Sequence, residues 1–135
     1  MSLPLPNAIV AVIEKDGRYL FVRRSYKRQS APGYWTPPSG RMEPGETEEQ
    51  AVEREMKEEL GLLVRPIEKI FESKTHDSGY RLHWWKVQLI EGEATCVDPE
   101  NTECRWVTLV EMEKLFPVFE EDIDVFQQLE EGKKS

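Results

Sequence analysis

The segment 40–62, GRMEPGETEEQAVEREMKEELGL, contains one helix whose two ends are both marked in the sequence. Thr47 and Gln50 form a capping box, which predicts that the helix begins at about Glu48. Gly61 readily adopts the left-handed conformation in which many helices end. Between these ends, apolar residues recur at helical spacing and predict a buried stripe: Ala51, Val52, Met56 and Leu60.

Three glutamates lie beside this stripe. Glu55, Glu58 and Glu59 are spaced i, i+3 and i+4, so their carboxylates leave one side of the helix. Like charges at this spacing repel one another by roughly 0.2–0.5 kcal/mol per pair. The last two also lie near the negative end of the helix dipole, which costs roughly 0.3–1 kcal/mol each. A bound Mg²⁺ would reverse these effects, because it coordinates carboxylate oxygens. For three glutamates taken alone, a solvated acidic face is the simpler interpretation.

A longer pattern surrounds these acids and changes that interpretation. The segment matches G-x5-E-x7-R-E-U-x-E-E-x-G-U, where U is apolar, at Gly40, Glu46, Arg54, Glu55, Met56, Glu58, Glu59, Gly61 and Leu62. In these residues the chain resembles the Nudix box of the Nudix hydrolase (MutT-like) family. A looser resemblance covers about residues 7 to 130, including Glu-x-x-Glu-x-x-Trp at Glu100, Glu103 and Trp106.

The resemblance implies roles for particular residues. Glu55, Glu58 and Glu59 would bind a divalent metal ion, Mg²⁺ or in its place Mn²⁺, with the Gly40 carbonyl as a further ligand and Glu100 as a candidate one. Glu46 and Arg54 would form a pair that braces the loop against the helix. One glutamate, from the box or from a later loop, would act as the general base, and its identity stays open.

The activity that the resemblance implies is Mg²⁺-dependent hydrolysis of a phosphoanhydride bond in a nucleoside diphosphate linked to another moiety. A nucleoside triphosphate would then give nucleoside monophosphate and pyrophosphate. The alternative is a non-catalytic nucleotide-sensing or interaction domain with the same fold. The intact box favours the enzyme.

Residues outside the box would select the substrate. Five basic residues could contact phosphates, although for most of them a solvated basic edge is the simpler interpretation: Arg23, Arg24, Lys27, Arg28 and Arg41. Tyr34, Trp35 and Trp84 could stack on a base. Because neighbouring residues of a strand face opposite ways, at least one of Trp84 and Trp85 should lie in the core instead.

The remaining chain alternates strands with helices. A β-branched apolar run over Ala8–Glu14 predicts a central strand covered on both faces, and Asp-Gly at 16–17 turns it into a hairpin with 19–23. Further strands are expected at 62–73, with an edge or bend at Pro66, at 80–90 and at 105–107, with a turn at 76–79. A capping box at Thr108 and an apolar stripe (Phe119, Ile123, Phe126 and Leu129) predict two helices. No steady βαβ rhythm is present, which indicates an α/β fold with a mixed sheet flanked by helices; the resemblance specifies an α/β/α sandwich.

Length, charge and cysteine content limit the domain organisation, partners and location. The 135 residues fit one domain, 1–135, with loose ends at about 1–6 and 132–135. The net charge of −8 argues against gripping a nucleic acid by bulk charge, whereas a small nucleotide remains compatible because bound cations override the local field. Without an apolar run of about 18 residues or a signal peptide, we expect a cytoplasmic protein that does not span a membrane. Cys96 and Cys104 are expected as free thiols. The sequence leaves the oligomeric state open, a homodimer included.

Overall fold

The computed structural model describes residues 4–75 and 79–134, so most of the predicted turn at 76–79 lies outside the described residues. In these described residues, seven strands and three helices follow one another. They are β1 (Asn7–Lys15), β2 (Arg18–Arg24), β3 (Trp35–Thr36), β4 (Ser39–Arg41), α1 (Glu48–Leu60), β5 (Leu63–Lys74), β6 (Arg81–Glu91), β7 (Asn101–Val107), α2 (Leu109–Met112) and α3 (Glu120–Gly132).

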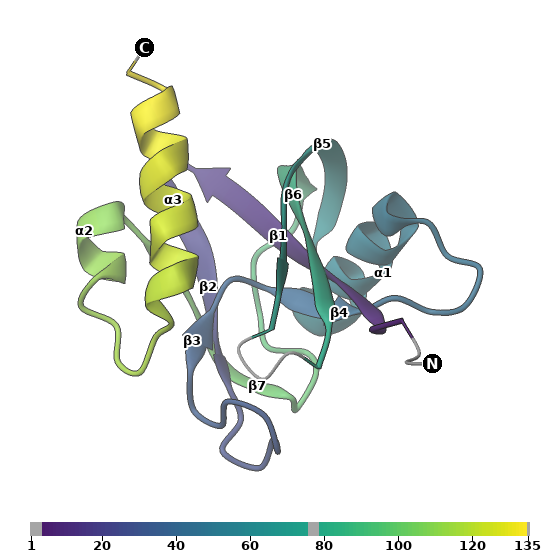
Figure 1. Cartoon of the computed structure of the whole chain (residues 1–135). Helices are drawn as coiled ribbons and strands as arrows, with labels where there is room; N and C mark the ends of the chain where they lie inside the picture. The colour runs from purple at the N-terminus through teal and green to yellow at the C-terminus, as the bar shows by residue number, and fades with distance from the viewer. Residues whose placement is uncertain (1–3, 76–78, 135) are drawn as a thin grey trace.

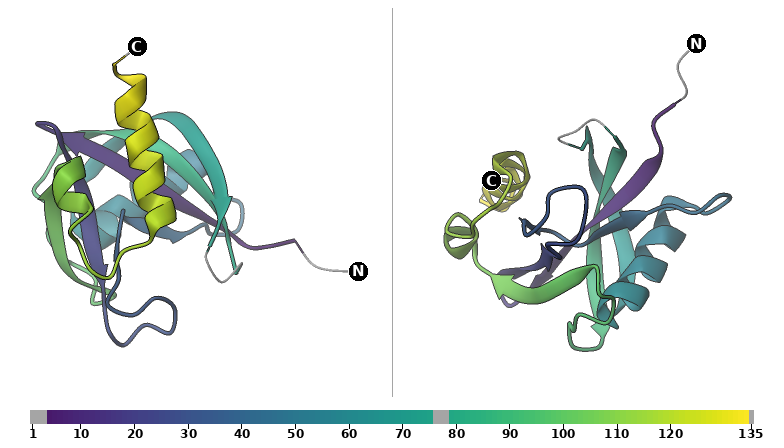
Figure 2. Two further views of the ribbon diagram at one scale, coloured as in Figure 1. Left: turned by 60° about the vertical axis from the view of Figure 1, so that its left-hand side comes forward. Right: turned by 90° about the horizontal axis from the view of Figure 1, so that it is seen from below.

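The strands form one mixed sheet around β1. The order is β3-β2-β1-β6-β5, with β4 paired to β1 and β7 to β2. β1 runs parallel to β6 and antiparallel to β2 and β4. Figure 1 shows α1 and α3 on opposite sides of the strands, and the view from below in Figure 2 agrees. The predicted sandwich, with helices flanking a mixed sheet, is confirmed.

Alternation along β1 explains its continuous apolar run. Ile9, Ala11 and Ile13 pack in the core cluster that includes the buried stripe of α1. Val10 and Val12 point the other way, into the cluster that α3 closes with Phe126. Both faces of β1 are therefore buried, as expected for a central strand with other elements packed on each side.

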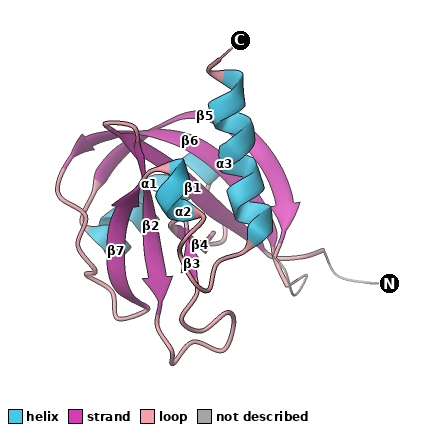
Figure 3. Cartoon of the chain, turned by 90° about the vertical axis from the view of Figure 1, so that its left-hand side faces the viewer, coloured by secondary structure: helices cyan, strands magenta, loops and turns pink. Residues whose placement is uncertain are grey.

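The helix boundaries follow the caps in the sequence. Thr47 accepts a hydrogen bond from the Gln50 backbone N–H, and Gly61 ends α1 in the left-handed region with φ 68°. Thr108 and Glu111 form the second capping box, at the start of α2. Figure 3 shows α2 beside the lower end of α3, over one face of the sheet.

One predicted strand boundary is wrong. The strand expected at 105–107 begins at Asn101, because its first residues pair with Arg24 and Arg23 at the end of β2. At the C-terminal end, α3 extends to Gly132, and the ammonium group of Lys133 lies 2.7 Å from the Glu14 carboxylate; the looseness expected from about 132 stays a prediction. A charge partner from the β1–β2 hairpin, which local sequence does not reveal, holds the end of the helix. Pro66 does lie on an edge strand, as predicted, beside an irregularity in the pairing of β5.

Candidate active site

Arg54 ties the loop before α1 to the helix. Its Nε donates to Glu46 Oε2 at 2.6 Å and its Nη2 to Glu46 Oε1 at 2.9 Å. The same Nη2 donates to the Arg41 carbonyl at 2.9 Å, and Glu46 also accepts a hydrogen bond from the Glu43 backbone N–H at 2.8 Å. Two-point contact between guanidinium and carboxylate is directional, so it sets the position of the loop as well as binding it.

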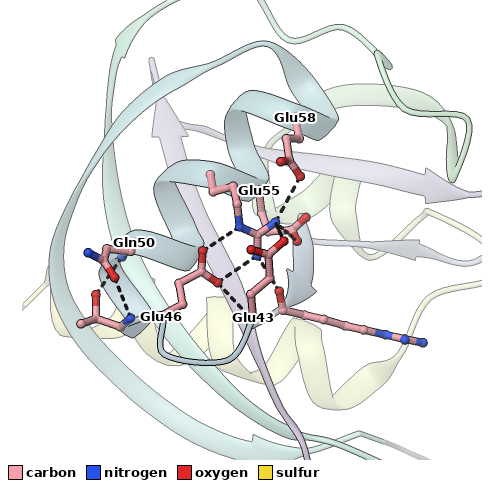
Figure 4. Close-up of polar contacts among 8 residues, drawn as sticks. Glu43, Glu46, Gln50, Glu55 and Glu58 are labelled. Atoms are coloured by element: carbon pink, nitrogen blue, oxygen red, sulfur yellow. Dashed lines mark hydrogen bonds and ion pairs between the residues drawn. The ribbon is translucent and has the colours of Figure 1, made fainter.

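The remaining donor group of Arg54 faces two of the box acids. Nη1 donates to Glu55 Oε1 at 2.8 Å and to Glu58 Oε2 at 3.1 Å. Figure 4 shows Glu43, Glu46, Glu55 and Glu58 turned toward the same guanidinium group. The guanidinium thus offsets part of the repulsion that the spacing of the glutamates predicts.

Gly40, at the middle of β4, lies directly against the carboxyl group of Glu55. A Cβ atom at residue 40 would come within 2.2 Å of the Glu55 carboxyl carbon. Any residue larger than glycine would therefore push this carboxylate away, which gives the glycine of the box a steric reason. Glu55 is 9% exposed, and burial raises the pKa of its carboxyl group although Arg54 acts to lower it.

Glu59 is the most deeply buried of the three box acids. Its side chain is 3% exposed, and its Oε2 has no hydrogen-bond partner among residues 4–75 and 79–134. Burial, together with the charges of Glu55 and Glu100, raises the pKa of Glu59 to about 8, whereas the charge of Arg28 acts to lower it. A buried carboxylate oxygen without a partner is costly unless a proton or a cation compensates it.

These residues fit a hard divalent cation. All the donor atoms are oxygens, the type that Mg²⁺ and Mn²⁺ prefer, and no His or Cys is among the predicted ligands. As placed, no group of three or more His, Cys, Asp or Glu side chains in the described part of the chain converges closely enough to hold an ion. Arg54 contacts both Glu55 and Glu58, so binding a cation there would require these acids to exchange contacts with the guanidinium.

Of the two later glutamates, Glu100 acts on the box acids through its charge, whereas Glu103 forms ion pairs elsewhere. Glu100 contributes to the raised pKa of both Glu55 and Glu59, and its backbone oxygen accepts a hydrogen bond from the Ser25 N–H. Glu103 instead forms ion pairs with Arg23 at 3.7 Å and Arg105 at 3.2 Å. Glu100 is therefore the later acid whose charge acts on Glu55 and Glu59.

The predicted base-stacking role is wrong for two residues, Trp84 and Trp35. Trp84 is 2% exposed, donates its Nε1–H to Ser73 at 3.1 Å, and makes edge contacts with Phe71 and Phe126. Trp35 is 3% exposed, and the guanidinium of Arg105 lies 4.7 Å from its ring centroid. Both rings are committed to the core, because β6 and β3 turn them toward the face that α3 covers.

The other predicted substrate residues lie at the surface or partly buried. Tyr34 stacks on Phe119 with 4.5 Å between ring centroids, and Arg23 donates to the Gly33 carbonyl at 3.2 Å. Arg41 is exposed, with its guanidinium 5.3 Å from the Tyr80 ring centroid. Their contacts with a substrate remain predictions.

Sequence reasoning missed several partners. His83 is 6% exposed and lies within hydrogen-bonding distance of Asn7 and Lys69, although no spacing in the sequence links these residues. Arg28 lies close enough to Glu59 to affect its pKa. No local periodicity could have revealed these relationships, because each joins segments that are distant in the chain.

The family comparison agrees with the fold and with the box. The model of the NUDIX domain matches residues 3–129, so this chain belongs to the NUDIX family. A solved structure described as the MutT protein from Methanosarcina mazei Go1 has a TM-score of 0.83 and 22% identity, covering 99% of this chain and 100% of that one. At this identity the likeness concerns the fold alone.

Two relatives share more sequence over shorter stretches. The CTP pyrophosphohydrolase of Escherichia coli (strain K12) is 35% identical over 88 residues, which is 64% of each chain. The nucleoside triphosphatase NudI of Enterobacter sp. (strain 638) is 43% identical over 53 residues, 39% of this chain and 38% of the relative. The matches therefore span less than two thirds of these relatives. In the described part of this chain, no helix is long and apolar enough to cross a membrane.

Proposed function

We propose that this protein hydrolyses a phosphoanhydride bond in a nucleoside diphosphate linked to another moiety, with Mg²⁺ as cofactor and Mn²⁺ as a substitute. A nucleoside triphosphate is the first candidate substrate, with nucleoside monophosphate and pyrophosphate as products. The names of the two relatives, a CTP pyrophosphohydrolase and a nucleoside triphosphatase, support this choice.

One observation carries the proposal. Glu59 is buried with an unpartnered Oε2, and the carboxyl group of Glu55 lies pressed against Gly40. A domain that only binds a ligand has no need for buried carboxylates whose ionisation burial opposes. Their clustering supports a catalytic metal site over the non-catalytic alternative.

Different residues of the chain would bind the metal and hold the site in place. Glu55, Glu58 and Glu59, with the Gly40 carbonyl and Glu100, would hold the metal, which when bound would neutralise phosphate charge and activate a water molecule. The Glu46–Arg54 pair would keep the loop at a fixed distance from the helix. The absence of a side chain at Gly40 would let the Glu55 carboxylate stay beside the backbone.

The nucleophile would come from solvent. None of the cysteine, serine or histidine side chains in the described residues contacts another in a base-activated arrangement typical of a covalent nucleophile. His83 is buried against Asn7 and Lys69, and the pKa of Cys96 is raised to about 11 by burial, so it is a poor nucleophile. We therefore expect no phosphorylated enzyme intermediate.

The test is a screen of nucleotides and nucleotide sugars with Mg²⁺, followed by a single turnover of the best substrate in ¹⁸O-labelled water. One ¹⁸O atom should appear in either the monophosphate or the pyrophosphate, and its location identifies the phosphorus attacked. A Glu59→Gln preparation, purified in the same way, controls for contaminating phosphatases. A phosphoenzyme, unlabelled first-turnover products, or equal rates from the variant would contradict the proposal.

A further inference from the structure

Positive charge is concentrated just before the box. The segment 17–42 holds six of the 18 basic residues of the chain and none of its 26 acidic residues. The basic residues are Arg18, Arg23, Arg24, Lys27, Arg28 and Arg41. Arg18 and Arg23 form ion pairs with Glu111 and Glu103, so Lys27 and Arg28 of the loop 25–34 are the better candidates for binding an anion.

The loop 25–34 brings part of this charge to the box carboxylates. The Ser25 N–H donates to the Glu100 carbonyl at 2.9 Å, and the Arg28 N–H donates to the Ser25 carbonyl at 3.2 Å. On the other side, the Glu100 N–H donates to Asp98 Oδ1 at 2.8 Å. Figure 1 shows the loop after β2 next to the segment that leads into β7. The backbone hydrogen bond from Ser25 to Glu100 thus joins the two segments where Arg28 and Glu100 meet.

Arg28 differs from Arg54 in its unused donors. Every nitrogen of the Arg54 guanidinium donates to a protein oxygen. Arg28 Nη2 lies 3.8 Å from Glu100 Oε2, beyond hydrogen-bonding distance, and its guanidinium donates to no other residue that the structure describes. Its side chain is 27% exposed. A half-buried guanidinium with open donors beside acidic residues is suited to a phosphate, which it can bind through two oxygens.

The box carboxylates determine which phosphate of a substrate would be repelled without a cation nearby. A metal held by the box would neutralise the two phosphates that flank the scissile bond. A third phosphate adds up to two negative charges beside Glu59 and Glu100, which would repel it. A sugar in the same place adds no charge. A cation at the edge of the carboxylate cluster therefore discriminates between the two kinds of substrate.

We propose that Arg28 binds the terminal phosphate of a nucleoside triphosphate and makes triphosphates better substrates than nucleoside diphosphates linked to an uncharged group. This inference rests on the proposed function, since it assigns a specificity residue to the same site. It concerns one arginine outside the box, and it predicts an effect on one substrate class only.

Binding provides a test that does not depend on turnover. Dissociation constants of α,β-methylene-CTP and α,β-methylene-CDP are measured by calorimetry with Mg²⁺ for the wild type, Arg28→Gln, Arg28→Lys and Lys27→Gln. Cytidine is replaced by another base if the screen favours one. Arg28→Gln should lower the affinity for the triphosphate analogue about 10- to 100-fold and the affinity for the diphosphate analogue less than about threefold. Arg28→Lys should fall between, because lysine keeps the charge and loses the fork.

Lys27→Gln is the matched control, since Lys27 is exposed in the same loop and its substitution removes the same charge. It should change either affinity less than about threefold. In steady state, Arg28→Gln should raise KM for CTP while kcat/KM for CDP-glucose stays within about threefold of the wild type. The melting temperature should stay within about 2 °C, because a partly exposed ion pair separated by 3.8 Å contributes little to folding.

Equal losses for the triphosphate and diphosphate analogues, or equal losses in Arg28→Gln and Lys27→Gln, would overturn the inference. An unchanged affinity in Arg28→Gln would overturn it as well. If the wild type binds the triphosphate analogue through Arg28 and yet hydrolyses no nucleotide, the proposed function fails and the assignment of Arg28 stands.

Discussion

Arg54 and Glu46 face each other eight residues apart and share two hydrogen-bonded contacts, at 2.6 and 2.9 Å. The same guanidinium also donates to Glu55 and Glu58, so the residue that braces the loop also contacts the acidic side of the helix. Loop position and carboxylate position are therefore coupled through one side chain, and a change at Arg54 should affect both.

Arg54→Lys should lower the free energy of unfolding by about 1–3 kcal/mol, because an ammonium group cannot make the two-point contact. This corresponds to a fall in melting temperature of roughly 3–10 °C. Hydrogen bonding to Arg54 lowers the pKa of Glu46, so the stabilisation is present above the ordinary carboxyl pKa and is lost as the pH falls through the lowered value. The difference from the wild type should shrink in acid. Arg65→Lys, at an exposed position of β5, is the control, and an equal loss there would contradict the assignment.

Glu59→Gln should abolish most activity without unfolding the protein. We expect kcat to fall by about 10²-fold or more, because the variant loses a carboxylate of the proposed metal site. The metal-free protein should be as stable as the wild type or slightly more stable, since burial and the charges of Glu55 and Glu100 oppose ionisation of the native carboxyl group. Glu53→Gln removes one charge from an exposed position of the same helix and should leave kcat unchanged. Full activity in Glu59→Gln would exclude the proposed site.

Mg²⁺ or Mn²⁺ should stabilise the folded protein by mass action. At a concentration about 100 times the dissociation constant, the expected gain is about 2.7 kcal/mol, seen as a higher melting temperature. The shift should be much smaller in Glu59→Gln. Zn²⁺ should not be preferred, because the site offers no His or Cys ligand. Calorimetry that detects neither Mg²⁺ nor Mn²⁺ binding, even with nucleotide present, would refute the cation site.

Asp122, in the first turn of α3, should make stability depend on pH. Burial raises the pKa of its carboxyl group to about 7, above the ordinary value of 3.8. The folded state therefore binds more protons than the unfolded state between these values, and stability from this group falls as the pH rises from about 4 to about 7. Asp122→Asn should be more stable than the wild type by on the order of 1–3 kcal/mol at pH 8 and equal to it near pH 4. Asp124→Asn, at an exposed position of α3, should show no such dependence in denaturant melts at the two pH values.

Trp84→Phe should affect stability and leave substrate affinity unchanged. The substitution removes the hydrogen bond to Ser73 and leaves a cavity against Phe126, which costs about 1–3 kcal/mol. Since Trp84 lies in the core, KM for the best nucleotide should stay within about twofold. A large rise in KM at unchanged stability would restore Trp84 as a substrate residue.

Features confined to short stretches could be predicted from the sequence. The capping boxes at Thr47 and Thr108 and the left-handed Gly61 bound their helices as expected, because capping depends on residues within one turn. The double burial of β1 follows from its unbroken apolar run. The resemblance rested on the same kind of evidence, since the box lies within 23 consecutive residues whose spacing is that of one loop and one helix.

Tertiary structure decided which residues far apart in the chain meet. Alternation required one of Trp84 and Trp85 to be buried, but only the packing of α3 on β6 chose Trp84. The association of Arg28 and Glu100 with Glu59 depends on a contact between the loop after β2 and the segment before β7. β7 begins at Asn101 because this residue pairs with Arg24 at the end of β2. The sequence determined the fold and the carboxylate cluster because periodicity and capping are local interactions, whereas charge and packing partners are set by the path of the folded chain.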